Sequence, residues 1–203
     1  MCSLLQVQEL ACAVGFCAFA LGGVFSSLGP LIAHTLLGVN SQLLLGSVVS
    51  VLFIANSTAQ SGMSGVKLTT SLRVGTVLIA IGLALVALAS HSGGLGLFLI
   101  GTVLAGAGQG ITISAATAVV SELGDARGRG QTSAVFFIIC YIGTAALALS
   151  TGAVATQTSL STALVVFCLL IAIFMAVLTT SQSHRWAHER TRTASQSIDT
   201  VQE

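Results

Sequence analysis

Long apolar stretches separated by short polar loops dominate the pattern of the sequence. Six of these stretches hold roughly 20 mostly apolar residues, the length that an α-helix needs to cross about 30 Å of hydrocarbon. They lie at about 11–36, 43–60, 74–90, 95–121, 132–155 and 160–181. The pattern predicts an all-α, polytopic membrane protein in which residues 1–182 form a bundle of six transmembrane helices. Residues 183–203 have a soluble composition, which predicts a flexible cytoplasmic tail.

The composition agrees with a chain whose main solvent is lipid. Charged residues make up 6% of the sequence and hydrophobic residues 54%, whereas a soluble domain carries about 25% charged residues. The body of the chain has no basic patch that would bind nucleic acid. Its five cysteines are scattered and show no zinc-ligand spacing, so we expect no metal site, no cofactor and no disulfide framework.

The basic residues predict the orientation. Lys67 and Arg73 fall between the second and third stretches, and Arg127 and Arg129 fall between the fourth and fifth. The remaining three arginines follow the sixth stretch, while the other three loops contain no Lys or Arg. Loops rich in Lys and Arg stay on the cytoplasmic side of a membrane. We therefore expect a multi-pass protein of the plasma (bacterial inner) membrane with both termini in the cytoplasm.

Several segments carry a resemblance to a known family. The first stretch reads GFCAFALGGVFSSLGPLIAHTLLG, and the fourth reads LIGTVLAGAGQGITISAATAVVSEL. The loop before the fifth stretch and the start of that stretch, residues 128–147, read GRGQTSAVFFIICYIGTAAL. They resemble the seventh, tenth and eleventh helices of bacterial major facilitator superfamily transporters. The loop SGMSGVKLTTSLRVG is similar to the basic signature that joins the second and third helices of each bundle in that family. Lys67, Arg73 and Gly75 remain of this signature, whereas its acidic residue and paired arginines are missing.

The resemblance covers about residues 10–180. It implies the C-terminal six-helix half of a transporter, in which the first and last three spans form a 3+3 inverted repeat. It also implies transport of a small solute by alternating access, without covalent chemistry. The partner in the bilayer would be a second six-helix bundle, the N-terminal half, or alternatively a second copy of this chain. The sequence does not name the solute, the direction of transport or a coupling ion.

Uncharged polar residues within the spans are the candidates for a substrate pathway. Polar groups in lipid usually bond to another helix or face a cavity, and both explanations fit the residues found here. The candidates are Ser26, Asn56, Gln109 and Tyr141. Each of the last three shares its helix face with a polar residue one turn later: Gln60, Thr112 and Thr144, respectively. Gln60 lies near the inner membrane surface, where we expect water to reach it.

Pro30 predicts a kink in the first helix, because proline has no N–H for the carbonyl of Ser26. Gly22, Ser26 and Pro30 recur at helical spacing on one face. Helix packing and a substrate pathway both explain this face.

Two other function classes fit six spans. The first is a non-transporting membrane scaffold or regulatory protein. The second is an intramembrane serine protease, because Gly62–Gly65 reads GMSG. That chemistry needs a histidine within hydrogen-bond reach of Ser64, and His34 and His91 fall toward the opposite surface, about 30 Å away. We therefore expect a transporter and no enzyme.

Overall fold

The structure is a computed structural model, and its described part contains six helices and no strands. The described residues are 2–35, 38, 40–63, 65–123, 129–175 and 177. Five helices are α1 (Cys2–Thr35), α2 (Gln42–Gly62), α3 (Leu68–Ser92), α4 (Leu95–Leu123) and α5 (Arg129–Gln157). A shorter apolar helix, Leu160–Met175, follows them and is called the sixth helix below.

The five labelled helices are long and apolar enough to cross a membrane. They confirm five of the six predicted spans and make this a helical membrane protein. The sixth predicted span, 160–181, corresponds to an apolar helix that is shorter in the described part of the chain. Apart from Val177, the rest of that span lies outside the described residues, as does the predicted tail at 183–203.

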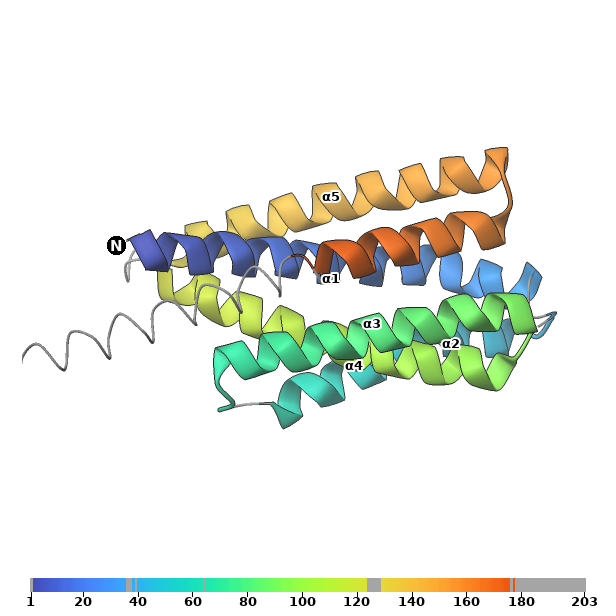
Figure 1. The fold of residues 1–203 in the computed structure, drawn as a ribbon, viewed down its shortest axis with the longest axis horizontal. Helices are drawn as coiled ribbons and strands as arrows, with labels where there is room; N and C mark the ends of the chain where they lie inside the picture. The colour runs from blue at the N-terminus through green and yellow to red at the C-terminus, as the bar shows by residue number, and fades with distance from the viewer. Residues whose placement is uncertain are drawn as a thin grey trace, which may run out of the picture.

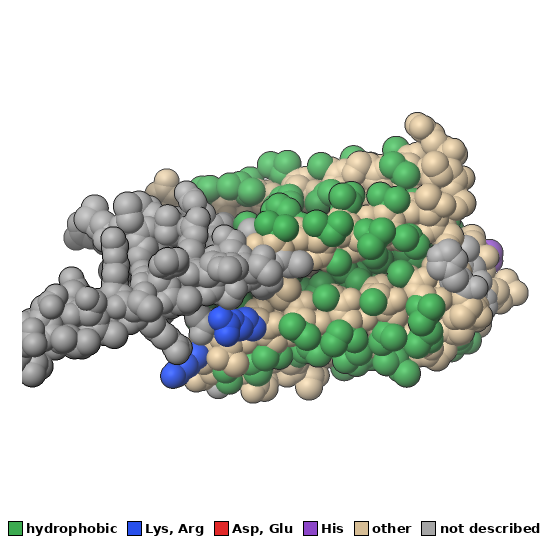
Figure 2. All heavy atoms as spheres, in the orientation of Figure 1, with side chains coloured by type: hydrophobic (Ala, Val, Ile, Leu, Met, Phe, Trp, Pro, Cys, Tyr) green, Lys and Arg blue, Asp and Glu red, His purple; other side chains and the backbone are tan. Residues whose placement is uncertain are grey.

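Successive helices run in opposite directions and are joined by short connections (Figure 1). As a result, α1, α3 and α5 begin at the same end of the bundle. Lys67 and Arg73, both exposed, lie at the start of α3, and Figure 2 shows the described basic side chains together at one end. His34 is exposed near the end of α1, at the opposite end of the bundle.

Helix α4 contacts α1, α2, α3 and α5 and occupies the centre of the fold. Glycines allow its closest contact, which is with the antiparallel α3. A Cβ on Gly82 would lie 2.5 Å from the backbone nitrogen of Ala105, and a Cβ on Gly108 would lie 2.5 Å from the carbonyl oxygen of Gly75. Gly101 in turn faces the Gly82 carbonyl. In lipid, small residues let helix backbones approach closely and gain packing contacts. Gly75 and Gly82 of α3 lie seven residues apart, as do Gly101 and Gly108 of α4, and the two pairs face each other.

A second pair of glycines fits α4 against α2. A Cβ on Gly106 would lie 2.6 Å from the carbonyl oxygen of Leu52, and a Cβ on Gly110 would collide with the carbonyl of Asn56. The spacing of four residues is the same on both helices, so α2 and α4 run parallel along this contact. The glycine-rich sequence of α4 is thus explained by two backbone contacts on different faces of one helix.

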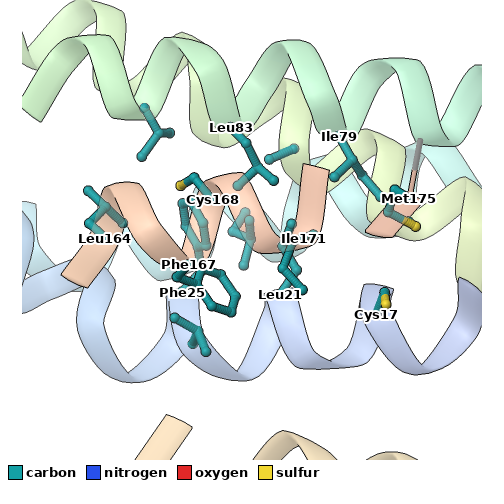
Figure 3. Close-up of a cluster of buried hydrophobic side chains, with 14 of the residues drawn as sticks. Cys17, Leu21, Phe25, Ile79, Leu83, Leu164, Phe167, Cys168, Ile171 and Met175 are labelled. Carbon is teal, nitrogen blue, oxygen red and sulfur yellow. The ribbon is translucent and has the colours of Figure 1, made fainter. Parts of the chain in front are cut away.

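Larger side chains fill the other half of the bundle. The sixth helix lies between α1 and α3, where Leu21 and Phe25 approach it from α1, and Ile79 and Leu83 from α3 (Figure 3). Its own buried side chains in this cluster are Leu164, Phe167, Cys168, Ile171 and Met175. This side of the fold therefore depends on interlocking side chains, in contrast to the backbone contacts around α4.

Helices α2 and α5 are the least covered. Only 17% of the residues in an 18-residue apolar window of α2, and 11% in that of α5, are buried, against 56% in α1 and in α4. Large apolar side chains such as Phe53, Ile54, Ile138 and Ile142 stand exposed on them. Such surfaces are normal only where lipid or another membrane segment covers them.

Candidate functional site

Two polar side chains meet α1 at a pair of adjacent glycines. Gln109 of α4 is 3% exposed, and its amide stands where a side chain on Gly22 would lie. Thr144 of α5 places its methyl group where a side chain on Gly23 would lie. We call Gly22, Gly23, Gln109 and Thr144 the double-glycine site. Only glycines at both positions leave room for these two side chains.

One oxygen atom on each of the two polar side chains has no hydrogen-bond partner within the described residues. These atoms are Gln109 Oε1 and Thr144 Oγ1, and both are buried. A buried polar atom without a partner costs about 1–3 kcal/mol, and most buried polar atoms in proteins have one. The double-glycine site therefore carries an energetic cost that its packing does not explain.

Two serines flank the site on α1. Ser26 Oγ donates to the carbonyl oxygen of Gly22 at 2.7 Å, and Ser27 Oγ donates to that of Gly23 at 2.8 Å. Such bonds from a serine to the preceding turn often bend a helix. Helix α1 continues through Pro30 to Thr35, and the kink at Pro30 stays a prediction. Ser26 and Gln109, two of the predicted pathway residues, therefore meet around Gly22.

Asn56 lies in a different interface. It is 6% exposed on α2, and its backbone lies against Gly110 of α4. Its Oδ1 accepts a hydrogen bond of 2.6 Å from Nε2 of Gln60. Gln60 is half-buried and paired, and the expected contact of its exposed part with water stays a prediction. Asn56 is thus a partnered residue of the α2–α4 contact, and the α1–α4 contact holds Gln109.

Tyr141 lies at the surface of the bundle, 63% exposed. Its ring meets Phe19 of α1 edge-on, with 5.7 Å between the ring centroids. Phe19 also contacts the rings of Phe136 and Phe137. Tyr141 contacts Phe19 of α1, and Thr144 contacts Gly23 of α1. The two residues therefore lie on the same face of α5, as their spacing predicts.

Thr144 is the residue that sequence reasoning did not select as a site residue. The available signal was its position in a span one turn after Tyr141, facing a helix that contains two successive glycines. Thr112 had the same kind of signal and lies elsewhere. It is fully buried, and its Oγ1 lies against Gly75 of α3 and also has no hydrogen-bond partner within the described residues. Thr112 and Gln109 therefore contact different helices although they are one turn apart.

The residues of the loop signature separate in the structure. Gly75 is buried and allows the close approach of α3 to α4. Lys67 is exposed before α3, and its carbonyl oxygen accepts bonds from the backbone N–H groups of Thr70 at 2.9 Å and Ser71 at 3.0 Å. Arg73, six residues after Lys67, is exposed as well. Gly75 therefore packs between helices, while Lys67 and Arg73 face the surroundings.

Two shallow grooves on the surface are mostly apolar. One of about 630 Å³ follows α1 and α5 and includes Leu28, Leu31 and Leu149. The other, of about 410 Å³, follows α2 and α4 and includes Val51 and Ile54. Neither groove is lined by a residue of the double-glycine site, whose two unpartnered oxygens are buried.

The chemistry available at the double-glycine site is hydrogen bonding. Within the described residues, no three His, Cys, Asp or Glu side chains are grouped so that they could hold a metal ion. The protease pattern cannot be followed at Ser64, which lies outside the described residues. The comparisons add no relative: the chain matches no family model, no curated protein and no solved structure.

Proposed function

We propose that this protein is one six-helix half of a secondary transporter and moves a small solute by alternating access. The observation that carries the proposal is the pair of buried, unpartnered oxygens on Gln109 and Thr144. Polar residues inside a membrane are costly and are usually kept for function. Their position at the junction of α1, α4 and α5 suits one wall of a solute pathway.

The pattern of helix contacts supports a 3+3 inverted repeat. In such a repeat α1 corresponds to α4, α2 to α5 and α3 to the sixth helix. The α2–α4 contact then corresponds to the α1–α5 contact, and the α1–α2 contact corresponds to the α4–α5 contact. All four contacts are present, and the α1–α4 contact maps onto itself. The sixth helix packs on α1, the position equivalent to that of α3 on α4, although it does so through side chains and not through backbone contacts. Inverted repeats of this kind build many transporter bundles.

The exposed faces of α2 and α5 support a second bundle as partner. These two helices are mostly uncovered, and in the proposed repeat they are equivalent, so they would meet a partner together. A second six-helix bundle then supplies the opposite wall of the pathway. A second copy of this chain is the alternative occupant. The common end of α1, α3 and α5, with Lys67 and Arg73, would face the cytoplasm of a bacterial cell.

Reconstitution in liposomes tests the proposal. The purified chain is compared, alone and together with a co-expressed N-terminal six-helix half, for uptake of a panel of radiolabelled solutes. We expect saturable uptake only when both proteins are present. Uptake by the chain alone, with crosslinking that gives a dimer, would identify the homodimer. Absence of saturable uptake in both arms, with the two proteins bound to each other, would favour a scaffold or regulatory protein instead.

A further inference from the structure

The double-glycine site differs from most other polar positions in the spans, because two of the three buried oxygens without a partner belong to it. The hydroxyls of Thr76, Thr102 and Thr151 are buried too, and each donates to the carbonyl four residues earlier, at 2.7–2.8 Å. Asn56 accepts from Gln60. The fold thus supplies partners for most buried polar groups by local bonds, and Thr112 Oγ1, which lies against Gly75 of α3, is the third buried oxygen without one. Thr144 has a carbonyl at the same spacing in its own helix but makes no such bond.

The side chains that carry the two unpartnered oxygens approach the same turn of α1 from two helices. The Gln109 amide nitrogen and the Thr144 methyl group stand nearest to the adjacent residues Gly22 and Gly23, and the oxygens lie farther away, 3.5 Å (Gln109 Oε1) and 4.0 Å (Thr144 Oγ1) from where a Cβ on these glycines would lie. Gln109 Oε1 is an acceptor only, whereas Thr144 Oγ1 can donate or accept. A ligand that satisfies both must carry at least one O–H or N–H donor.

The charge of the surroundings restricts the ligand further. Residues 13–35 of α1, 95–121 of α4 and 130–157 of α5 contain no Asp, Glu, Lys or Arg. A charged group would be costly to bring into lipid without an opposite charge. The rings of Phe19 and Tyr141, which lie beside the site on α1 and α5, add an apolar wall. The site therefore suits a small, neutral group that donates a hydrogen bond.

The part of α1 that covers the two oxygens has few constraints of its own. It contains two glycines without side chains, two serines bonded back to the glycine carbonyls, and Pro30, which lacks an N–H. We propose that Gln109 and Thr144 bind a neutral solute through a hydrogen bond that the solute donates, and that the Gly22–Gly23 turn of α1 covers this site in the present structure. This inference rests on the proposed transport function and names the class of its substrate.

The first test measures stability with a matched control on one helix. Thr144→Val and Gln109→Leu remove an unpartnered oxygen and leave no partner behind, so the apparent Tm of the purified chain should rise by about 2–4 °C. Thr151→Val removes a hydroxyl whose bond to Leu147 is intact, so its Tm should stay the same or fall. If Thr144→Val and Gln109→Leu both lower the Tm as Thr151→Val does, the oxygens stabilise packing and the proposal is wrong.

The second test asks whether a water-soluble molecule reaches the site. Thr144→Cys and Thr151→Cys are made in a chain whose five native cysteines are replaced by alanine, and each is treated in membranes with a neutral, hydroxyl-bearing maleimide. We expect labelling at position 144 at least about tenfold faster, a difference of about 1.4 kcal/mol in the free energy of opening. Equal rates at both positions would mean that α1 does not uncover the site.

The Thr144→Cys chain keeps Gln109 Oε1, the acceptor of the proposed donated bond, so competition during the same labelling tests the ligand class. Glycerol and acetamide donate hydrogen bonds, whereas dimethyl sulfoxide only accepts them. We expect the two donors to slow labelling at position 144 and dimethyl sulfoxide to leave it unchanged. Equal effects of all three would exclude recognition through a donated bond. Labelling requires no transport, so a site that opens and binds in a chain that shows no uptake with its partner would disprove the transport function and leave the site intact.

Discussion

The contact between α3 and α4 leads to a quantitative prediction for Gly82→Ala. The new Cβ would lie 2.5 Å from the Ala105 nitrogen, 2.7 Å from the Gly101 carbonyl oxygen and 2.9 Å from the Ala105 Cα. All three are backbone atoms inside a helix, which cannot turn aside as the end of a flexible side chain can. The two helices must therefore separate.

The distances set the size of the effect. Ordinary contact begins at 3.4 Å, so the shortest contact must lengthen by about 0.9 Å, the difference between 3.4 and 2.5 Å. A gap of that size removes roughly a quarter to a half of the dispersion attraction of the atoms that line it. Overpacking costs about 1–3 kcal/mol. We expect the upper half of that range, because separation at Gly82 also loosens the neighbouring contact between Gly75 and Gly108.

Unfolding in mixed micelles, titrated with dodecyl sulfate and followed by circular dichroism, measures the loss. Gly46→Ala is the control, because a Cβ on this helical glycine meets nothing within 4 Å. Alanine favours helix over glycine by about 0.8–1.0 kcal/mol, so Gly46→Ala should match or exceed the stability of the wild type. Gly82→Ala should lower it.

A double variant sharpens the test. A Cβ on Gly101 would lie 2.8 Å from the Gly82 carbonyl oxygen, so both alanines act on one contact. Once the first has separated the helices, the second should cost clearly less than it does alone, which is the non-additivity of neighbouring sites. If Gly82→Ala is as stable as Gly46→Ala, or if the two costs add, close backbone packing of α3 on α4 is not what these glycines provide.

Three further predictions concern pairing, orientation and the exposed tyrosine. Gln60→Met should lower stability by about 0.5–1.5 kcal/mol because it leaves Asn56 Oδ1 without its donor, and adding Asn56→Leu should restore part of the loss; an unchanged unfolding curve for Gln60→Met would contradict this. Ser159→Cys should react with an impermeant maleimide added outside intact cells, and Val66→Cys should react only after lysis, since exposed loops at opposite ends of the bundle hold these residues; the reverse result would invert the topology. Tyr141→Phe keeps the ring contact, so its Tm should stay within about 2 °C of the wild type, while uptake by the assembled transporter should fall if the hydroxyl meets the solute.

The helices themselves could be predicted from the sequence with good accuracy. The stretches 43–60 and 95–121 correspond to α2 at Gln42–Gly62 and α4 at Leu95–Leu123. The length of an apolar run is a local property, and the thickness of the hydrocarbon fixes how long it must be. The first helix begins at Cys2, well before the predicted span at 11, while its apolar part begins at Ala13. A helix can continue beyond the membrane surface, so hydropathy locates the span and not the helix end.

The neighbours of each side chain could not be read from the sequence. In a soluble helix an apolar face turns toward the core, but in lipid the outer face is as apolar as the inner one. Helix α4 is apolar almost all round, so its sequence does not say that Gly106 and Gly110 meet α2 while Gly101 and Gly108 meet α3. The choice depends on how the backbones fit together, which is a matter of shape.

The sequence by itself determined that this chain has helices long and apolar enough to span a membrane, that its basic residues fall in alternate loops or beside them, and that the middle of each span carries only uncharged polar groups. Only the tertiary structure decided which of those groups have partners. Asn56 is paired with Gln60, whereas Gln109 and Thr144 stand unpaired against two adjacent glycines of α1. Whether a buried oxygen is satisfied depends on the rotation of its helix and the atoms of its neighbours, and these follow from the packing of all the helices together.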